Sequence, residues 1–329
     1  MILKQTDFRE KKLILEKKKQ NRKGVLFLFL ITVVISCLLW AGQSLKSWWQ
    51  NFYKPTSYKI ESNDKSLELF IGFKPDLKDN EGVKKSINLI VSKLAGKYGF
   101  YFYDLKTTNS IGLNENEVFI AASVNKVPIM VNFYKLQENG KVNENDIYVL
   151  KYQDIQDYGT GQMRYQPVGT EYKYSDLINL IGKKSDNTAA YVLEELIGQE
   201  KIQASLDKLK MTNTSMKNNT TTPKEMGDYF VWLYEDKLLE KENKEKIFKA
   251  LQKTDFEDRI SQGIPDVDIS HKIGNEIQTY NDCGIIFGSK PSFAANPYVL
   301  CILTKEVSET EALKTIPKIS KLLWEYINK

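Results

Sequence analysis

The sequence predicts an α+β protein: a mostly antiparallel five-stranded sheet with flanking helices and an inserted all-helical lobe, preceded by one N-terminal transmembrane helix. Three observations lead to this prediction. Strand-like alternation near residues 98–120 returns over residues 268–304, the stretch between them has mainly helical periodicity, and residues 24–42 carry no charge. Because strands from both ends of the domain enclose the helices, we expect one sheet, with its site in the cleft beside the helical lobe.

The first 66 residues divide into a basic tail, an apolar segment and a linker. Residues 1–23 hold nine Lys or Arg and three acids, and residues 24–42 would span roughly 28 Å as a helix, about one hydrocarbon core. The positive-inside rule places the basic tail in the cytoplasm. We therefore expect a cytoplasmic tail at 1–23, a transmembrane helix at 24–42, a juxtamembrane linker at 43–66, and an extracytoplasmic domain at 67–329 anchored to the cell membrane.

Two alternatives remain for the apolar segment. A cleaved signal peptide would end in an Ala-x-Ala site, and none follows here. Val34-Ile35-Ser36-Cys37 resembles a bacterial lipoprotein box, but the apolar residues Leu38, Leu39 and Trp40 follow the cysteine where polar residues are usual. We favour an uncleaved anchor, while cleavage or lipidation near Cys37 stays open.

The net charge of +5 does not indicate a nucleic-acid partner. Much of the excess lies in residues 1–23, and the remainder of the chain is nearly balanced. We therefore expect contact with a membrane through residues 24–42 and no nucleic-acid binding.

The domain is expected to begin with a helix at 82–97, strands at 98–105 and 117–120 joined by a turn at 109–114, and a helix from 123 to about 138. Helices are predicted at 174–182, 187–197, 201–209, 223–234 and 241–253, and strands at 268–274, 280–288 and 298–304, before a last helix at 309–326. Thr222 and Pro223 have the residue types of a helix cap and first helical position.

The inventory of reactive side chains is short. The chain has one histidine, His271, and outside the apolar segment only Cys283 and Cys301. A histidine-based triad would need that single ring, and a catalytic metal lacks its commonest ligands. Two cysteines are too few for a disulfide framework, so we expect them to be small buried apolar residues. We expect no metal and no cofactor.

A serine paired with a lysine remains as a route to an activated nucleophile. A desolvated lysine has a lowered pKa and can accept a hydroxyl proton near neutral pH. The pattern Ser-x-x-Lys occurs three times, beginning at Ser62, Ser123 and Ser205, so by itself it carries no weight. Ser62 lies in the polar linker and Ser205 within a predicted helix, where ordinary surface positions explain them.

Ser123 lies in a different context. It follows the apolar segment Phe119–Ala122 and precedes Val127–Val131, an apolar helical run that would hold Lys126 in a low dielectric. The i, i+3 spacing turns both side chains toward each other. The helix N-terminus would also favour a developing oxyanion, although a simple capping serine has the same residue type.

Two more triplets complete a pattern. Ser185-Asp186-Asn187 begins 62 positions after Ser123, and Lys272-Ile273-Gly274 lies on a predicted strand. With Ser123-Val124-Asn125-Lys126, they make the chain similar to the penicillin-recognising serine hydrolases, specifically the class A β-lactamase-like domain, whose signatures are Ser-x-x-Lys, Ser-Asp-Asn and Lys-Thr-Gly in this order. The segment Thr220–Pro223 resembles a further family landmark, and the resemblance covers about residues 67–329.

The resemblance implies a role for each matched residue. Ser123 would attack a carbonyl carbon, Lys126 would serve as base, and Ser185 would relay a proton to the leaving nitrogen with Lys272 nearby. A second group would bind the substrate. Asn187 would hold its amide side chain, Lys272 would attract a carboxylate, and Gly274 would leave the edge strand open to an extended peptide. The implied substrates are β-lactams or D-alanyl peptides.

Two departures from the family pattern concern function. Ile273 stands where the family has Thr or Ser, which removes a hydroxyl that resembles a donor to the substrate carboxylate. Met211–Asn219 contains no acid, whereas class A β-lactamases have a longer omega loop with a deacylating glutamate there. Glu225 and Asp207 are poor substitutes by position. We therefore expect weak β-lactam hydrolysis.

Two hypotheses follow. The first is a membrane-anchored extracytoplasmic serine hydrolase of class A β-lactamase type, acylated at Ser123. The alternative is a catalytically impaired penicillin-binding or cell-wall-binding module, which Ile273 and the absent omega-loop acid favour and the intact first two motifs oppose. The natural substrate and the oligomeric state stay open.

Overall fold

The computed structural model describes residues 75–288 and 296–329. The predicted tail at 1–23, transmembrane helix at 24–42 and linker at 43–66 lie outside these residues. Within the described ranges, no helix combines the length and apolar character that crossing a membrane requires.

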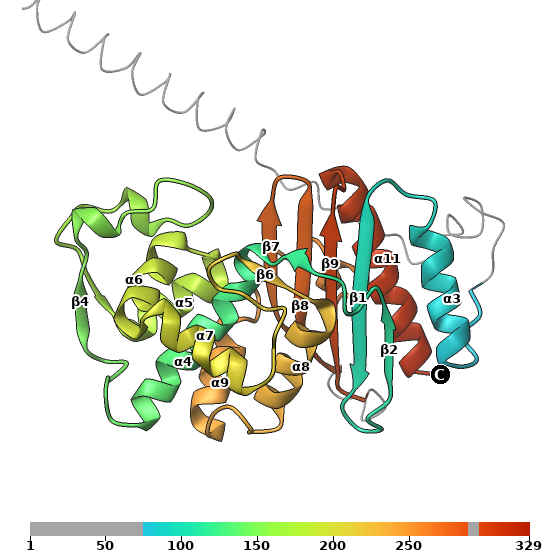
Figure 1. Ribbon diagram of the computed structural model, residues 1–329, viewed down its shortest axis with the longest axis horizontal. Coiled ribbons are helices and arrows are strands. Elements are labelled where there is room, and N and C mark those ends of the chain that lie inside the picture. The colour runs from blue at the N-terminus through green and yellow to red at the C-terminus, as the bar shows by residue number, and fades with distance from the viewer. Residues whose placement is uncertain (1–74, 289–295) are drawn as a thin grey trace, which may run out of the picture. The chain divides into compact units, whose positions relative to one another are not determined.

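A five-stranded sheet with the order β2-β1-β9-β8-β7 forms the centre of the domain, and every neighbouring pair is antiparallel (Figure 1). Its strands are β1 (Lys97–Asp104), β2 (Ser110–Leu113), β7 (Asp268–Glu276), β8 (Thr279–Gly288) and β9 (Tyr298–Lys305). Two short pairs lie apart from it: β3 (Phe119–Ile120) with β6 (Thr220–Thr221), and β4 (Ile147–Val149) with β5 (Glu171–Lys173). The predicted α+β class and five-stranded sheet are confirmed.

Helices precede, follow and interrupt the sheet. They are α3 (Asn80–Val91), α4 (Lys126–Glu138), α5 (Tyr174–Lys184), α6 (Asn187–Ile197), α7 (Gln199–Lys208), α8 (Pro223–Tyr234), α9 (Lys241–Ala250), α10 (Ile260–Gly263) and α11 (Glu309–Ile327). Short 3-10 turns are η1 (Ala122–Asn125), η2 (Tyr152–Asp154) and η3 (Met163–Tyr165). The side chain of Thr222 accepts a hydrogen bond from the Glu225 amide and Pro223 begins α8, as the cap prediction required.

The prediction of a sheet strand at 117–120 is wrong. Its apolar residues form β3, which pairs with β6 outside the five-stranded sheet. The strand beside β1 is Ser110–Leu113, which lies in the segment predicted as a turn. The chain turns earlier because Asp104 Oδ1 accepts hydrogen bonds from the amides of Lys106 and Thr107.

Different helices cover the two faces of the sheet. α8 contacts β1, β8 and β9, whereas α3 contacts β2, and α11 contacts α3, β8 and β9 (Figure 1). The aromatic residues of β1 divide between the faces by alternation. Tyr98, Phe100 and Phe102 belong to the core beneath α3 and α11, and the ring of Tyr101 lies against Gly227 of α8.

The predicted lobe is inserted between β3 and β7, but it is not all-helical, because the short antiparallel pair of β4 and β5 lies between α4 and α5. α4 contacts α5, α6, α7 and α9, so it forms the centre of the lobe. Its first turn, η1, contacts β7 and β8 of the sheet. The start of α4 therefore lies at the junction of the lobe and the sheet.

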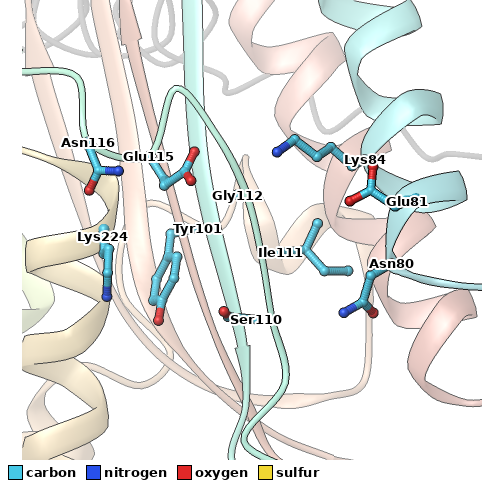
Figure 2. Close-up of a pocket in the computed structure, with 10 residues that line it drawn as sticks. All are labelled: Asn80, Glu81, Lys84, Tyr101, Ser110, Ile111, Gly112, Glu115, Asn116 and Lys224. Carbon is cyan, nitrogen blue, oxygen red and sulfur yellow. The ribbon is translucent and has the colours of Figure 1, made fainter.

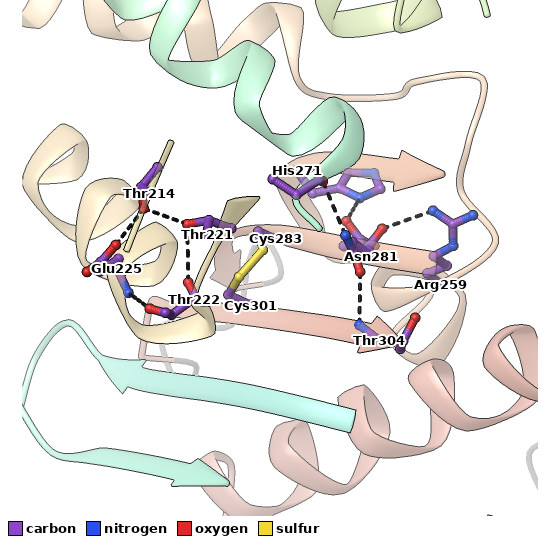
Figure 3. The surroundings of a disulfide bond; sticks show 12 residues. Thr214, Thr221, Thr222, Glu225, Arg259, His271, Asn281, Cys283, Cys301 and Thr304 are labelled. Atoms are coloured by element: carbon purple, nitrogen blue, oxygen red, sulfur yellow. Dashed lines mark hydrogen bonds and ion pairs between the residues drawn. A yellow bond between two sulfur atoms is a disulfide. The ribbon is translucent and has the colours of Figure 1, made fainter. Parts of the chain in front are cut away.

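Cys283 of β8 and Cys301 of β9 form a disulfide (Figure 3). Both residues are fully buried, but the expectation that they are simple apolar residues is wrong. They lie directly opposite each other in the antiparallel register, which brings their Cβ atoms close enough for a bridge. The separation of 18 residues could not show this, because the register was unknown from the sequence.

Candidate active site

The predicted nucleophile lies in a single turn of 3-10 helix. Ser123 belongs to η1, which leads directly into α4, and it is partly exposed. Ala122, the residue before it, has a φ of 51°, a conformation that side chains with a Cβ rarely adopt. Such backbone strain concentrates at functional sites. Within the described part of the chain the Ser123 hydroxyl makes no hydrogen bond, so the expected contact with Lys126 is not formed in this state.

A buried asparagine of β8 holds this turn from behind. Asn281 Nδ2 donates to the carbonyl oxygens of Ile120 at 2.8 Å and Ala121 at 3.2 Å. Asn281 Oδ1 accepts from the Thr304 amide of β9 at 2.9 Å (Figure 3). Asn281 thus fixes the Ser123 turn to the sheet. The sequence predicts no role for Asn281, whose only signal is an amide within a buried strand.

Lys126 is the first residue of α4, and its side chain is almost fully buried. Its Nζ donates to the Ser185 carbonyl oxygen at 2.5 Å and to Asn187 Oδ1 at 2.6 Å, and it lies 3.4 Å from Ser185 Oγ. Burial lowers the pKa of Lys126 to about 7, and the negative charge of Asp186 only partly opposes this shift. Near neutral pH the amine is therefore available in its neutral form.

Ser185 links the two lysines of the predicted site. It ends α5 in the left-handed conformation, with φ of 53°, and is completely buried. Its Oγ accepts a hydrogen bond from Lys272 Nζ at 2.8 Å and also lies within reach of Lys126 Nζ. Because a hydroxyl can donate as well as accept, Ser185 Oγ can pass a proton between an amine and a third group.

The Ser-Asp-Asn triplet is fixed by the loop before α5. Asp186 caps α6 with one carboxylate oxygen and accepts from the amides of Gln162 and Met163 with the other. The amide group of Asn187 lies between Lys126 Nζ and the Tyr158 carbonyl oxygen. It is thus engaged by the protein, and its expected role toward substrate requires an exchange of partners.

Lys272 lies in β7, the edge strand of the sheet, and is almost completely buried. Its Nζ donates to Ser185 Oγ and, at 3.2 Å, to the Ile273 carbonyl oxygen. Burial, reinforced by the neighbouring charge of Lys126, holds the pKa of Lys272 well below its usual value. Its positive charge is therefore weakened.

Gly274 permits close contact between β7 and the turn that carries Ser123. A Cβ at this position would lie 2.5 Å from the Ala121 carbonyl oxygen and 3.1 Å from the Ala122 Cβ and Val124 Cγ2. The structure thus shows a packing reason for this glycine. The prediction that Gly274 leaves the edge of β7 open to an extended peptide stays a prediction. β7 is the outermost strand of the five-stranded sheet.

His271 lies in a buried charge cluster beside the site. Its Nδ1 is 2.8 Å from Asp282 Oδ1, and its Nε2 is 3.3 Å from Glu257 Oε1. Burial alone would lower the pKa of His271, but the two carboxylates outweigh it and raise the pKa to about 10. Because both ring nitrogens face carboxylates, His271 is not placed to serve as a base for Ser123.

The segment Met211–Asn219 approaches the nucleophile turn without bringing an acid to it. The Asn219 carbonyl oxygen accepts from the Ala121 amide, and Asn219 Oδ1 accepts from Asn125 Nδ2. Glu225 is turned the other way, to the Asn213 amide and the Thr214 hydroxyl (Figure 3). In the described ranges no cluster of His, Cys, Asp and Glu side chains suits a metal.

A cavity of about 280 Å³ lies elsewhere, where β1 and β2 meet α3 and α8 (Figure 2). Its lining is polar and includes Glu81, Lys84, Glu115 and Lys224. It contains none of the predicted site residues.

The sheet, the inserted lobe and the Ser123 turn between them have the fold of β-lactamase-like and penicillin-binding-protein-like serine hydrolases. The chain belongs to the beta-lactamase enzyme family, whose profile matches residues 82–327. A comparison with curated proteins finds no match.

Solved structures support the fold. PBP-A is 22% identical, with a TM-score of 0.69 over 74% of this chain and 94% of that one. A mutant of PBP-A, solved as an acyl-enzyme complex with penicillin G, is 20% identical, with a TM-score of 0.68 over 74% and 96%. A beta-lactamase from Sphaerobacter thermophilus is 23% identical, with a TM-score of 0.68 over 74% and 96%. At these identities the matches establish the fold.

Proposed function

We propose that this chain is an extracytoplasmic serine hydrolase of class A β-lactamase type that β-lactams or D-alanyl peptides acylate at Ser123. Residues 24–42 would anchor it in the membrane. The observation that carries the proposal is the convergence of Lys126 and Lys272 on Ser185 Oγ, with Lys126 three residues after Ser123 at the start of α4. This arrangement supports a role for a neutral amine and a proton relay near Ser123, which follows the strained residue Ala122.

Acylation follows from these groups. Ser123 Oγ attacks the carbonyl carbon, and its proton passes to the neutral Nζ of Lys126. As the C–N bond breaks, Ser185 Oγ donates its proton to the leaving nitrogen and regains one from a lysine amine. The product is an ester of Ser123; the amine leaves when the substrate is a D-alanyl peptide and stays attached to the acyl group when it is a β-lactam. Lys126 must first turn from Asn187 toward Ser123, and catalytic hydrogen bonds are often loose before substrate binds.

Deacylation lacks a comparable base. The short segment Met211–Asn219 holds no acid, and Glu225 is occupied by Asn213 and Thr214. Without a carboxylate to activate water, the acyl-enzyme should persist. β-Lactam hydrolysis is then slow, and the protein behaves as a penicillin-binding enzyme toward these compounds.

Two observations support a location outside the cytoplasm. The buried Cys283–Cys301 disulfide is typical of proteins that mature in an oxidising compartment. The basic tail and uncharged segment of the first 42 residues have the pattern of an inward-facing N-terminus followed by a span.

The test is covalent labelling by penicillin. Full-length protein in detergent is incubated with benzylpenicillin, and intact mass is followed over hours. We expect one adduct per chain, with a lifetime long compared with its formation. Ser123→Ala should form none, while Ser205→Ala, which alters another Ser-x-x-Lys match, should be labelled like the wild type. Labelling of Ser123→Ala would contradict the proposed nucleophile, and rapid loss of the adduct would contradict slow deacylation.

The second candidate is a wall-binding module that has lost the reaction. The Ser123 hydroxyl without a hydrogen bond to Lys126 favours this alternative. The same assay separates the two, because a non-catalytic module would retain penicillin reversibly and gain no mass.

A further inference from the structure

The free edge of β2 lies within the polar cavity at the other side of the sheet. β2 is the outermost strand on that side, and its residues Ser110 and Gly112 line the cavity of about 280 Å³. α3 flanks this edge on one face of the sheet and α8 on the other (Figure 2). The cavity is therefore a groove that follows a sheet edge between two helices.

The backbone groups along this edge are unpaired. The Asp104 amide donates to the Asn109 carbonyl oxygen, and from there every second residue of β2 exchanges hydrogen bonds with β1. Ser110 and Gly112 are the residues between these pairs, so their N–H and C=O groups point away from β1. No group in the described ranges pairs with them. Two donors and two acceptors are thus free at alternate positions of the edge.

One charged side chain without a partner lies on each wall of the groove. Lys84 belongs to α3, and its amine is directed toward β2 (Figure 2). Glu115 lies on the α8 face, since Gly112 stands opposite Tyr101 and a Cβ at Gly112 would be 2.6 Å from Glu115 Cδ. Both charged side chains are half-buried, and in the part of the chain that the structure describes neither forms a hydrogen bond or an ion pair.

The other charges of the groove are engaged or hydrated. Lys224 Nζ is paired with Asp228 at 2.7 Å and lies over the ring of Tyr101. Glu81, in the first turn of α3, is exposed and therefore stays solvated. Lys84 and Glu115 are thus the charged groups that a ligand in the groove can pair.

An extended peptide matches this arrangement. Its N–H and C=O groups alternate as those of the edge do, so it can pair with Ser110 and Gly112 by adding a strand to β2. Successive side chains of a strand point to opposite faces, so one residue would face Lys84 and the next Glu115. An acidic residue suits the first position and a basic residue the second. A free amino acid or an inorganic anion would leave the edge unpaired.

We infer that the groove binds an extended peptide that adds a strand to β2 and carries an acidic and a basic side chain at successive positions. Ser110 and Gly112 are about 6.8 Å apart along the strand, so about three residues of ligand span the free groups. A second copy of the chain fits less well, because its own β2 is flanked by the same two helices. The groove lies at the opposite edge of the sheet from β7 and does not rest on the proposed function.

The probe is the peptide acetyl-Thr-Glu-Lys-Thr-amide, and its binding to the full-length protein in detergent is measured by saturation-transfer NMR against detergent alone. We expect saturable binding with a Kd of about 1 mM or tighter. Of two analogues N-methylated at Glu or at Lys, one should bind at least about fivefold more weakly and the other like the parent, because only alternate N–H groups face β2. No saturable binding, or equal effects of both analogues, would overturn the inference.

Two variants at one position locate the binding edge. Ser110→Pro removes a free N–H without removing a bond to β1, a change that edge strands tolerate, whereas Ser110→Ala keeps the N–H and removes only the hydroxyl. We expect Ser110→Pro to weaken binding at least about fivefold and Ser110→Ala less than about twofold. Urea unfolding checks that both variants fold. Unchanged binding by folded Ser110→Pro would show that the peptide does not pair with β2.

A double-mutant cycle tests the charges. Lys84→Gln should weaken the parent peptide about threefold but not the peptide in which Gln replaces Glu. Glu115→Gln should act in the same way on the parent and on the peptide in which Gln replaces Lys. Losses that are equal for parent and substituted peptides would contradict the proposed pairing of the side chains.

Discussion

Three side chains explain most of the chemistry proposed for this site. Lys126 and Lys272 are both buried, and they share the hydroxyl of Ser185. Two adjacent ammonium groups in a low dielectric repel each other and lose hydration, so at least one amine is neutral near pH 7. A neutral amine is what a serine nucleophile needs from its neighbour.

The pKa of Lys126 predicts how acylation depends on pH. Burial lowers this pKa to about 7, and only the neutral amine accepts the Ser123 proton. Below pH 7 the neutral fraction falls about tenfold per unit, so the acylation rate constant should rise with pH to about 7 and then level off. Acylation rate constants, measured by quenching the reaction with benzylpenicillin at set times between pH 5 and pH 9, give this profile.

Lys126→Arg provides the control, because a guanidinium stays protonated throughout the range. We expect it to lose about 10² to 10⁴ in rate, the usual contribution of a general base, together with the pH step. A wild-type profile that is flat across pH 7 would show that Lys126 is not the titrating base.

The motif residues meet in the structure, but their contacts differ in part from the predicted ones. Lys126, Ser185, Asn187 and Lys272 converge as the motifs predicted. Asn281, which fixes the nucleophile turn, was missed because a buried asparagine in a strand has no spacing rule. Its function depends on which carbonyl groups the fold brings beside it.

At the scale of elements, the contact between η1 and β7 determines the geometry of the site. β7 carries Lys272, η1 carries Ser123, and Gly274 lets the two elements meet. Asn281 of β8 also holds the turn, but β7 is the strand that carries Lys272, so the η1–β7 contact sets the distance between Ser123 and Lys272. A small change in this contact should therefore affect acylation more than folding.

Gly274→Ala tests this contact. The added methyl group would lie 2.5 Å from the Ala121 carbonyl oxygen, so β7 and the turn must separate. Overpacking of this kind costs about 1–3 kcal/mol of unfolding free energy, and we expect the acylation rate to fall at least tenfold because the reacting groups move apart. Urea unfolding and penicillin labelling measure the two effects.

Gly140→Ala is the matched control. This variant makes the same glycine-to-alanine change at a position where no atom lies within 4 Å of the new Cβ. Gly140 follows the C-terminal end of α4, away from the Ser123 turn at its start. It should lose some stability because its φ is 66°, without losing acylation. Equal losses of acylation in both variants would mean that general destabilisation, not the η1–β7 contact, explains the result.

At the scale of the molecule, one covalent bond joins two central strands. The Cys283–Cys301 disulfide closes a separation of 18 residues and lies within the main core. Replacing both cysteines by alanine should lower the free energy of unfolding by about 3 kcal/mol, since the unfolded chain regains the entropy of the open loop. Urea unfolding of the full-length chain, with and without reductant, measures this loss.

Thiol titration checks the bond directly. Of three cysteines, two are paired in the structure, so one thiol should react in denaturant without reductant and all three after reduction. Three reactive thiols before reduction would show that the bridge is not formed in the isolated protein, and reductant would then leave stability unchanged.

The sequence by itself determined the fold class, most helix bounds and the motifs whose four side chains converge, because periodicity, caps and motif spacing are local properties of the chain. The helix predicted at 187–197 has the bounds of α6. The tertiary structure alone decided two features: that Ser110–Leu113, not 117–120, pairs with β1, and that Cys283 meets Cys301. Each depends on strand register, which long-range packing determines and no local pattern encodes.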